Sequence, residues 1–304
     1  MNKKILLIYN PVAGRDSERP TALDIVSLFP ADYRITVRYT YGRGSGTELV
    51  RDYGAECEMI VICGGDGTLH EAINGLMSAE MKKPIGYIPI GSTNDLAVAL
   101  GIPQKPEDAV KLIVSGGIKK IDLGKINGDY FTYVACFGPG TAISYSTPQS
   151  LKNKIGYSAY MFNGFVLNLF HTVKQAKPKR LNIECDGKVY DDNYYFGAIS
   201  NSTSVAGMFR YDENDISLND GRFEVILVRK VKNPLDFFRV FHKIVKREYD
   251  DDGLLYFKAS HIKIVFEKKE DWSLDGESMS GVESADISVL NNAVEIFSES
   301  KLCD

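Results

Sequence analysis

The chain has 304 residues, of which 44% are hydrophobic and 25% are charged, and its formal net charge is -4. This length suits two domains better than one core, and the composition is that of a globular protein. The small negative charge gives no general attraction for nucleic acid, so we expect no nucleic-acid partner. A membrane is not excluded, because a local basic face would suffice to bind one.

The first 125 residues alternate short apolar strands with helical stretches. The strand runs are KILLIYN, YRITVRYT, EMIVIC and PIGYIPI, and the helical stretches are Ser17–Phe29, Gly46–Tyr53, Thr68–Leu76, Thr93–Leu100 and Pro106–Val114. EMIVIC is continuously apolar, as expected for a strand that is covered on both faces. The alternation predicts a parallel sheet with helices on both faces.

The pattern changes near residue 121. Short strand-like runs follow, separated by turn signals: YFTYVACF, RLNIEC, NYYFGAIS, FEVILVRK, HIKIVFEKK, ADISVL and VEIFSES. They predict an antiparallel β-sandwich, interrupted by helical stretches at Gly156–Val173 and Pro234–Tyr249. We therefore expect an α/β domain at residues 1–125 and a β-rich domain at residues 126–304, with the last strand a candidate to pack back on the first domain.

A glycine-rich turn, Gly64-Gly65-Asp66-Gly67-Thr68, follows EMIVIC and opens the next helix. Glycines let the backbone approach a phosphate closely, and the free N–H groups of a helix N-terminus can bind it. The Asp66 carboxylate would repel phosphates unless a metal ion or a proton transfer uses it, and Mg²⁺ usually accompanies ATP. The alternative is an ordinary turn with Asp66 as the helix cap. Five specified residues at one strand-to-helix junction favour the phosphate site.

The GGDGT turn resembles that of the diacylglycerol kinase catalytic-domain family, the soluble bacterial lipid kinases related to sphingosine and ceramide kinases. NAD kinases carry a similar turn, so the resemblance implies an NAD kinase-like α/β nucleotide-binding domain. The segment Asn10–Gly14 is similar to the family's NPxxG turn. The segment Ile90–Ala97 is similar to the G-T-x-N-D-x-A motif, which is typical of the lipid kinases rather than the NAD kinases.

The resemblance implies that ATP lies on the first domain, against the turns that follow its strands. The residues so implicated are Asn10, Pro11, Val12, Ala13, Gly14, Thr40, Gly64, Gly65, Asp66, Gly67, Thr68, Leu69, His70, Glu71, Ser92, Thr93 and Asn94. Each group has a plainer interpretation as an ordinary turn or a helix cap. We interpret His70 as helix surface rather than as a metal ligand.

The segment Leu274–Glu277 resembles the family's DGE motif, which reaches the cleft from the second domain. Two carboxylates at one turn can accept a proton or position Mg²⁺ and its water. The alternative is a solvated surface turn. We expect Asp66, Asp275 and Glu277 to be catalytic, and the sequence leaves open which of them is the base.

The turn Asp220-Gly221 resembles the family's structural Mg²⁺ site. The resemblance implies Ser217, Asp220 and the backbone of Arg222 as its metal ligands. A hairpin turn without a metal is an equally good interpretation of the same residues.

No segment predicts secretion or membrane insertion. The N-terminal apolar run ends at Asn10 and is too short for a signal peptide. The longest apolar stretch, Tyr157–Phe170, contains polar residues and falls short of the roughly 20 residues that span a bilayer. The five cysteines form no CxxC pair, which favours neither a zinc site nor disulfides. We therefore expect a cytoplasmic protein.

These motifs together predict an ATP- and Mg²⁺-dependent kinase that phosphorylates the hydroxyl of diacylglycerol or a related membrane lipid. Alternative acceptors are a sphingoid base, phosphatidylglycerol or NAD, and a different alternative is a lipid or nucleotide sensor without catalysis. Such a kinase must touch the inner face of the membrane transiently, and Pro234–Tyr249 could be its docking helix or a core helix with a solvated basic face. A homodimer is also consistent with the resemblance.

Overall fold

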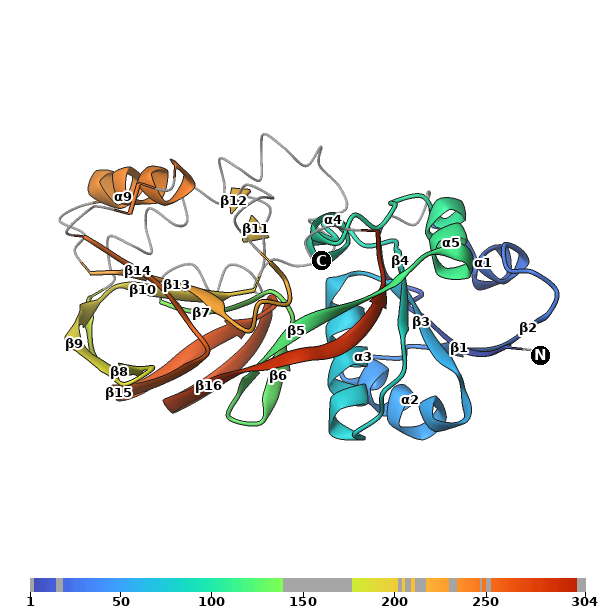
Figure 1. Ribbon diagram of the computed structural model, residues 1–304, viewed down its shortest axis with the longest axis horizontal. Helices are drawn as coiled ribbons and strands as arrows, with labels where there is room; N and C mark the ends of the chain where they lie inside the picture. Colours follow the sequence, from blue (N-terminus) through green and yellow to red (C-terminus); the bar gives the residue numbers. More distant parts are fainter. Residues whose placement is uncertain are drawn as a thin grey trace.

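The computed structural model describes residues 3–14, 19–138, 177–201, 204–205, 209–210, 217–229, 234–246, 248–249 and 253–299. The predicted helix at Gly156–Val173 lies outside these residues. The molecule is elongated, with parallel strands and most helices at one end and antiparallel strands at the other (Figure 1). Within the part that is described, no helix is both long and apolar enough to cross a bilayer.

The N-terminal part is a parallel sheet in the order β4-β3-β1-β2. Helices α2 and α3 cover one face and helices α1 and α5 cover the other (Figure 1). Every residue of β3 and β4 is buried, whereas β2 is an edge strand. The elements are β1 (Lys3–Tyr9), α1 (Ala22–Ser27), β2 (Tyr33–Tyr39), α2 (Ser45–Tyr53), the 3₁₀ turn η2 (Gly54–Glu56), β3 (Met59–Gly64), α3 (Asp66–Ser78), β4 (Ile85–Pro89), α4 (Asp95–Ala99) and α5 (Pro106–Ser115).

Two helices begin later than the sequence pattern predicted, for local reasons. Helix α1 begins after Thr21 because Thr21 and Asp24 form a capping box. Helix α4 begins at Asp95 because Asn94 has a left-handed backbone, with φ of 52°, and cannot continue a helix.

The C-terminal part consists of antiparallel strands around a second core. Aromatic rings fill this core, where Phe137 packs against Phe266 and Trp272. The strand β14 has no counterpart among the predicted runs. The elements are β5 (Ile118–Ile126), β6 (Asp129–Phe131), β7 (Val134–Phe137), β8 (Lys179–Cys185), β9 (Lys188–Tyr194), β10 (Phe196–Ser200), β11 (Ser204–Val205), β12 (Phe209–Arg210), β13 (Phe223–Val228), α9 (Pro234–Lys246), β14 (Leu254–Ala259), β15 (His261–Leu274) and β16 (Glu277–Phe297).

One long strand, β16, connects the two parts. It pairs antiparallel with β15 and β5, and its residue Ile296 pairs in parallel with Ile85 of β4. The two runs ADISVL and VEIFSES therefore belong to a single strand. Among the described residues, 14 strands form one sheet that extends through both parts. The predicted mixed architecture, parallel α/β followed by antiparallel β, is confirmed. The continuity of the sheet fixes the β15–β16 turn relative to the glycine-rich turn.

Candidate active site

Three turns meet at the carboxyl ends of β1, β3 and β4. The backbone N–H of Asn10 donates to Cys63 O over 2.9 Å, and that of Ile90 donates to Gly64 O over 2.9 Å. The Asn10 side chain donates to Thr68 Oγ1 over 2.8 Å. The structure thus brings together the segments Asn10–Gly14, Gly64–Thr68 and Ile90–Ala97. Open α/β sheets bind ligands at this edge.

Glycines allow these turns to touch through their backbones. A Cβ atom on Gly91 would lie 2.5 Å from Gly65 Cα, and one on Gly14 would lie 2.1 Å from Ile90 O. Gly14 also has a positive φ of 69°. Both contacts are too close for any side chain, so glycine is required for the packing of the turns as well as for access to a ligand.

The Asn94 side chain shapes the third turn from within. Its Oδ1 accepts from Gly91 N over 3.0 Å and from Tyr87 OH over 3.3 Å, and the residue is only 4% exposed. We therefore assign it to holding the turn rather than to direct ligand contact. Its neighbours Ser92 and Thr93 are exposed and can reach a ligand.

Asp66 is half-buried, and one oxygen of its carboxylate makes no hydrogen bond. Its Oδ2 accepts from Thr93 Oγ1 over 3.2 Å and from Asp95 N over 3.1 Å. Its Oδ1 is buried and has no hydrogen-bond partner. Burial raises the pKa of Asp66, and burial together with the charge of Asp66 raises the pKa of Asp95 to about 6. Two carboxylates with an orphaned oxygen are destabilised until a cation or a proton neutralises them.

This pair fits Mg²⁺, which prefers carboxylate oxygens and keeps several water or phosphate ligands. Asp66 and Asp95 would hold the ion, and the ion would neutralise charge on bound phosphates. Across the described ranges, no cluster of three or more His, Cys, Asp or Glu side chains forms a complete metal site. A ligand set completed by water and phosphate is consistent with that finding.

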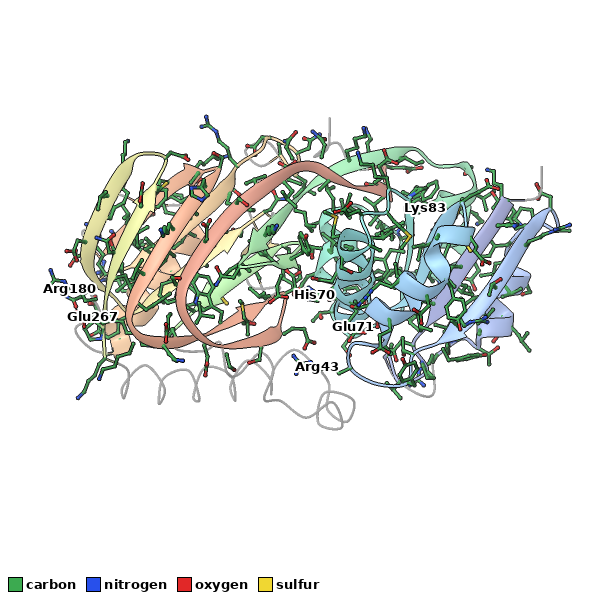
Figure 2. The ribbon with its side chains drawn as sticks, turned by 90° about the horizontal axis from the view of Figure 1, so that it is seen from below. Arg43, His70, Glu71, Lys83, Arg180 and Glu267 are labelled. Carbon is green, nitrogen blue, oxygen red and sulfur yellow. The ribbon has the colours of Figure 1, made fainter. Side chains whose placement is uncertain are left out.

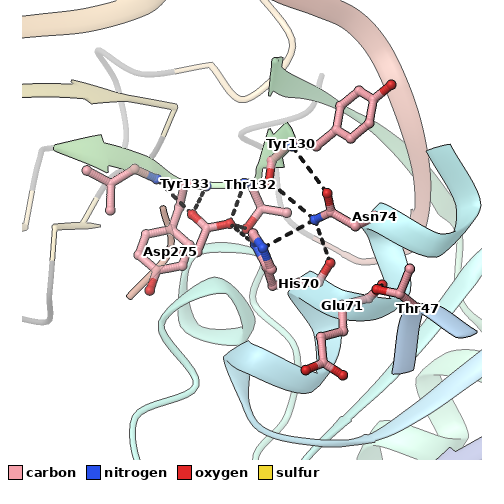
Figure 3. A network of polar contacts seen from close by, with 9 residues as sticks. Thr47, His70, Glu71, Asn74, Tyr130, Thr132, Tyr133 and Asp275 are labelled. Carbon is pink, nitrogen blue, oxygen red and sulfur yellow. Dashed lines mark hydrogen bonds and ion pairs between the residues drawn. The ribbon is translucent and has the colours of Figure 1, made fainter. Parts of the chain in front are cut away.

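Asp275, at the β15–β16 turn, is surrounded by donors (Figure 3). Its Oδ1 accepts from the backbone N–H groups of Tyr133, over 2.9 Å, and Val134, over 3.0 Å. Its Oδ2 accepts from Thr132 N over 2.6 Å and from Thr132 Oγ1 over 2.8 Å, and lies 3.0 Å from His70 Nδ1. Five contacts use every lone pair of this carboxylate, so none is free to take a proton from a substrate.

His70 connects the two parts of the molecule and does not lie on the helix surface, so that interpretation was wrong. Its side chain is 13% exposed and its Nδ1 faces Asp275. Asn74, one turn along α3, lies 3.3 Å from His70 Nε2 and accepts from Tyr130 N over 3.2 Å (Figure 3). This face of α3 packs against β6, which is why a polar residue there is covered.

The charge of His70 depends on its acidic neighbours. Burial by itself lowers the pKa of His70. The hydrogen bond to Asp275 outweighs it, together with the charges of Asp275, Glu277 and Glu71, and the pKa is raised above its ordinary value. The His70–Asp275 contact thus gains strength when the imidazole is protonated.

Glu277 lies over the glycine-rich turn. Its Oε1 is 3.4 Å from the place where a Cβ atom on Gly67 would stand, and its Oε2 is 2.9 Å from Arg43 Nη2. Its side chain is 39% exposed, so a bound ligand can reach it. The C-terminal part therefore adds a carboxylate to the site that the N-terminal turns form.

The resemblance implied that Glu71 contacts ATP, but its carboxylate binds the backbone of another segment. Its carboxylate accepts from Gly44 N over 2.6 Å and from Gly46 N over 2.8 Å, at the start of α2. Its backbone carbonyl accepts from Thr47 Oγ1 over 2.8 Å. These contacts cap α2 and tie the β2–α2 loop to α3, so Glu71 positions that loop.

The other predicted nucleotide contacts differ in exposure. Ala13 and Leu69 are buried in the packing of the turns, whereas Val12 is 64% exposed. Thr40 is half-buried, and its N–H donates to Tyr9 O over 3.0 Å. Only the exposed and half-buried positions are open to a ligand.

Comparison with known proteins gives this site its family. Residues 4–126 match the family model described as the diacylglycerol kinase catalytic domain. The diacylglycerol kinase of Bacillus subtilis (strain 168) is 33% identical over 281 residues, which cover 90% of each protein. The chain belongs to the diacylglycerol kinase family. The predicted family and the predicted class of enzyme, a lipid kinase, are confirmed.

Solved structures agree on the fold of the kinase. A diacylglycerol kinase from Bacillus anthracis str. Sterne has a TM-score of 0.72 at 21% identity, with 99% of this chain and 98% of that chain covered. An NAD kinase from Archaeoglobus fulgidus in complex with ATP has a TM-score of 0.53 at 13% identity, with 99% and 95% covered. The predicted NAD kinase-like architecture is confirmed.

The turn around Asp220, predicted to bind a structural Mg²⁺, is held by hydrogen bonds between its own residues. Ser217 Oγ donates to Asn219 Oδ1 over 2.6 Å, and Arg222 N donates to Asp220 Oδ1 over 3.0 Å. Lys258 Nζ lies 3.4 Å from Asp220 Oδ2. The same ammonium lies closer to Glu224, 2.9 Å from its Oε1, so one lysine is shared by two carboxylates. The metal at this turn stays a prediction.

The sequence interpretation did not include two polar residues of the site. Asp95 stands within the segment Ile90–Ala97, but no role was predicted for it from the sequence. Arg43 lies in the β2–α2 loop, outside every motif, and no sequence signal placed it opposite Glu277.

Proposed function

We propose that this lipid kinase transfers the γ-phosphate of ATP to the hydroxyl of diacylglycerol or of a related membrane lipid. The main support is the position of Glu277, which reaches from the C-terminal part over the glycine-rich turn near Gly67. A phosphate site and a carboxylate from the other part of the molecule are what transfer between two bound substrates requires. The ATP complex of the A. fulgidus NAD kinase, which shares the fold, also supports ATP as the donor.

In this proposal the ATP phosphates lie against the glycine turns and the N-terminus of α3. The helix N–H groups and partial positive charge stabilise them. The exposed hydroxyls of Ser92 and Thr93 contact the nucleotide. Asp66 and Asp95 hold Mg²⁺.

In this proposal Glu277, rather than Asp275, accepts the proton of the lipid hydroxyl. Glu277 is partly exposed and lies over the turn, whereas every lone pair of Asp275 is occupied. The lipid oxygen forms its bond to the γ-phosphorus as the bond from that phosphorus to ADP breaks, and Glu277 takes the hydroxyl proton. Asp275 positions the turn that carries Glu277.

Contact with the membrane is part of the proposal, because the acceptor is a lipid. Helix α9 presents Leu235, Arg239, His242 and Lys246 to solvent, and their spacing of four, three and four residues puts them on one face. A basic face with an exposed leucine suits an anionic lipid surface. Charge reversal at Lys246 should weaken sedimentation with anionic vesicles and leave neutral vesicles unaffected. A homodimer remains a prediction that sedimentation velocity would test.

The acceptor is identified by phosphate transfer from radiolabelled ATP in mixed micelles. The panel contains diacylglycerol, monoacylglycerol, phosphatidylglycerol and sphingosine, with NAD as a soluble control. We expect labelled phosphatidic acid with the wild-type enzyme and about 100-fold less, or lower still, with Asp66→Asn. Labelled NADP, or ATP binding without transfer to any lipid, would contradict the proposal; the second result would favour a sensor.

A further inference from the structure

Arg43 is a cation that meets the site from the loop between β2 and α2. Its Nη2 lies 2.9 Å from Glu277 Oε2, so the ion pair joins the N-terminal part to the β15–β16 turn. The Arg43 side chain is 70% exposed, and it lies close to Glu71 at the border between the two parts of the molecule (Figure 2). The residue belongs to neither the nucleotide motifs nor the DGE motif.

The loop that carries Arg43 is held to the helix of the glycine-rich turn. Gly44 and Gly46, on the C-terminal side of Arg43, both donate to the Glu71 carboxylate. On its N-terminal side, Gly42 O accepts from Ser45 Oγ over 2.6 Å. Since Glu71 is on α3, the backbone of Arg43 is fixed relative to the N-terminus of that helix. Because its backbone is anchored, the Arg43 side chain can place its guanidinium at the glycine-rich turn in a defined position.

The charges of the site call for such a group. Three carboxylates, Asp66, Asp95 and Glu277, surround a turn that is built to receive phosphate. Phosphoryl transfer proceeds by positioning and by neutralisation of charge on the transferred group, and a guanidinium matches phosphate oxygens with paired donors. An ion pair as exposed as Arg43–Glu277 adds little stability, so little free energy is lost when Arg43 leaves Glu277 for a phosphate.

We propose that Arg43 is a further catalytic residue of this kinase and binds the terminal phosphate of ATP. When ATP is bound, the guanidinium leaves Glu277 for the γ-phosphate and stabilises the charge of the group in transfer. Glu277 is thereby freed to accept the proton of the lipid hydroxyl. Without ATP, the Glu277 carboxylate takes the place of the phosphate beside Arg43. This inference rests on the proposed function, because it assigns a role within the same reaction.

The test compares Arg43→Ala, Arg43→Lys and, as a matched control, Arg51→Ala, which removes an exposed arginine at the far end of α2. Two measurements are made: steady-state transfer to lipid, and calorimetric binding of ADP and of a non-hydrolysable ATP analogue without lipid. Arg43→Ala should lower kcat/KM for ATP about 100-fold or more, by analogy with other charge-stabilising donors. It should weaken the analogue about tenfold and ADP less than threefold, with Arg43→Lys intermediate.

The binding measurement separates this inference from the proposed function. If the wild type transfers no phosphate to lipid, the proposed function fails, and the ADP-to-analogue comparison still decides the role of Arg43. If Arg43→Ala binds the analogue as tightly as Arg51→Ala does, and also binds ADP as tightly, the inference is overturned. Equal losses for ADP and analogue in Arg43→Ala would overturn it too, because that result indicates a collapsed loop.

Discussion

Replacing Asp275 tests the claim that this carboxylate positions the site. In Asp275→Asn, the amide nitrogen at the Oδ2 position can donate to Thr132 Oγ1 and to an unprotonated His70 Nδ1. The Thr132 N–H then loses its acceptor, and the proton of the neutral imidazole sits on Nε2, opposite the Asn74 amide nitrogen. Each buried donor without a partner costs about 1–3 kcal/mol of the free energy of unfolding.

Asp275→Ala removes the acceptor of three backbone N–H groups, those of Thr132, Tyr133 and Val134. By the same estimate the loss is about 3–9 kcal/mol, a large part of the roughly 5–15 kcal/mol that stabilises a domain. The assay is urea unfolding followed by circular dichroism at pH 7 without nucleotide. Ser280→Ala, an exposed change next to the same turn, should stay within about 0.5 kcal/mol of the wild type. If both Asp275 variants match this control in stability and yet lose activity, Asp275 is catalytic and the positioning role is wrong.

Three further predictions follow from single residues. Because the pKa of His70 is raised in the folded state, its protonation stabilises the fold below about pH 6.5, and this contribution should fade as pH rises through the folded-state pKa. The free energies of unfolding of the wild type and His70→Gln, measured from pH 5.5 to 9, should therefore converge at high pH. A difference that widens with pH would contradict this prediction. Asp95→Asn relieves the crowded carboxylates, so at pH 7.5 in EDTA its free energy of unfolding should rise by about 1–3 kcal/mol. Mg²⁺ is expected to stabilise the wild type and not this variant, and an equal Mg²⁺ effect on both would remove Asp95 from the metal site. Gly91→Ala places a methyl group 2.5 Å from Gly65 Cα and should cost about 1–3 kcal/mol and abolish nucleotide binding, whereas Gly42→Ala, which meets no atom within 4 Å, serves as the control and should be neutral.

The local parts of this site could be predicted from the sequence. The segment Gly64–Thr68 stands at a strand-to-helix junction, and the run Met59–Gly64 is apolar throughout, so the turn and its strand follow from spacing alone. The carboxyl ends of parallel strands then put this turn beside Asn10 and Ile90 by the rules of the fold.

The contacts between distant segments could not be predicted. His70 and Asp275 are 205 positions apart, and nothing in either local sequence indicates the other. The same holds for Arg43 and Glu277, whose pairing depends on how β16 returns to β4. Helix periodicity assigns polar residues such as His70 to the exposed face, and no local signal indicates that another part of the chain covers that face. Glu71 likewise carries no sign that it caps a different helix.

The central claim, that carboxylates from both parts of the molecule act on one phosphate, is tested most directly by single-turnover transfer of labelled phosphate from ATP to lipid. Asp66→Asn removes the carboxylate of the glycine-rich turn and Glu277→Gln removes the one from the β15–β16 turn. We expect each to slow transfer about 100-fold or more, the usual effect of losing a general base or a charge-stabilising group, while Arg51→Ala retains the wild-type rate. Full rates in both Asp66→Asn and Glu277→Gln would contradict the account.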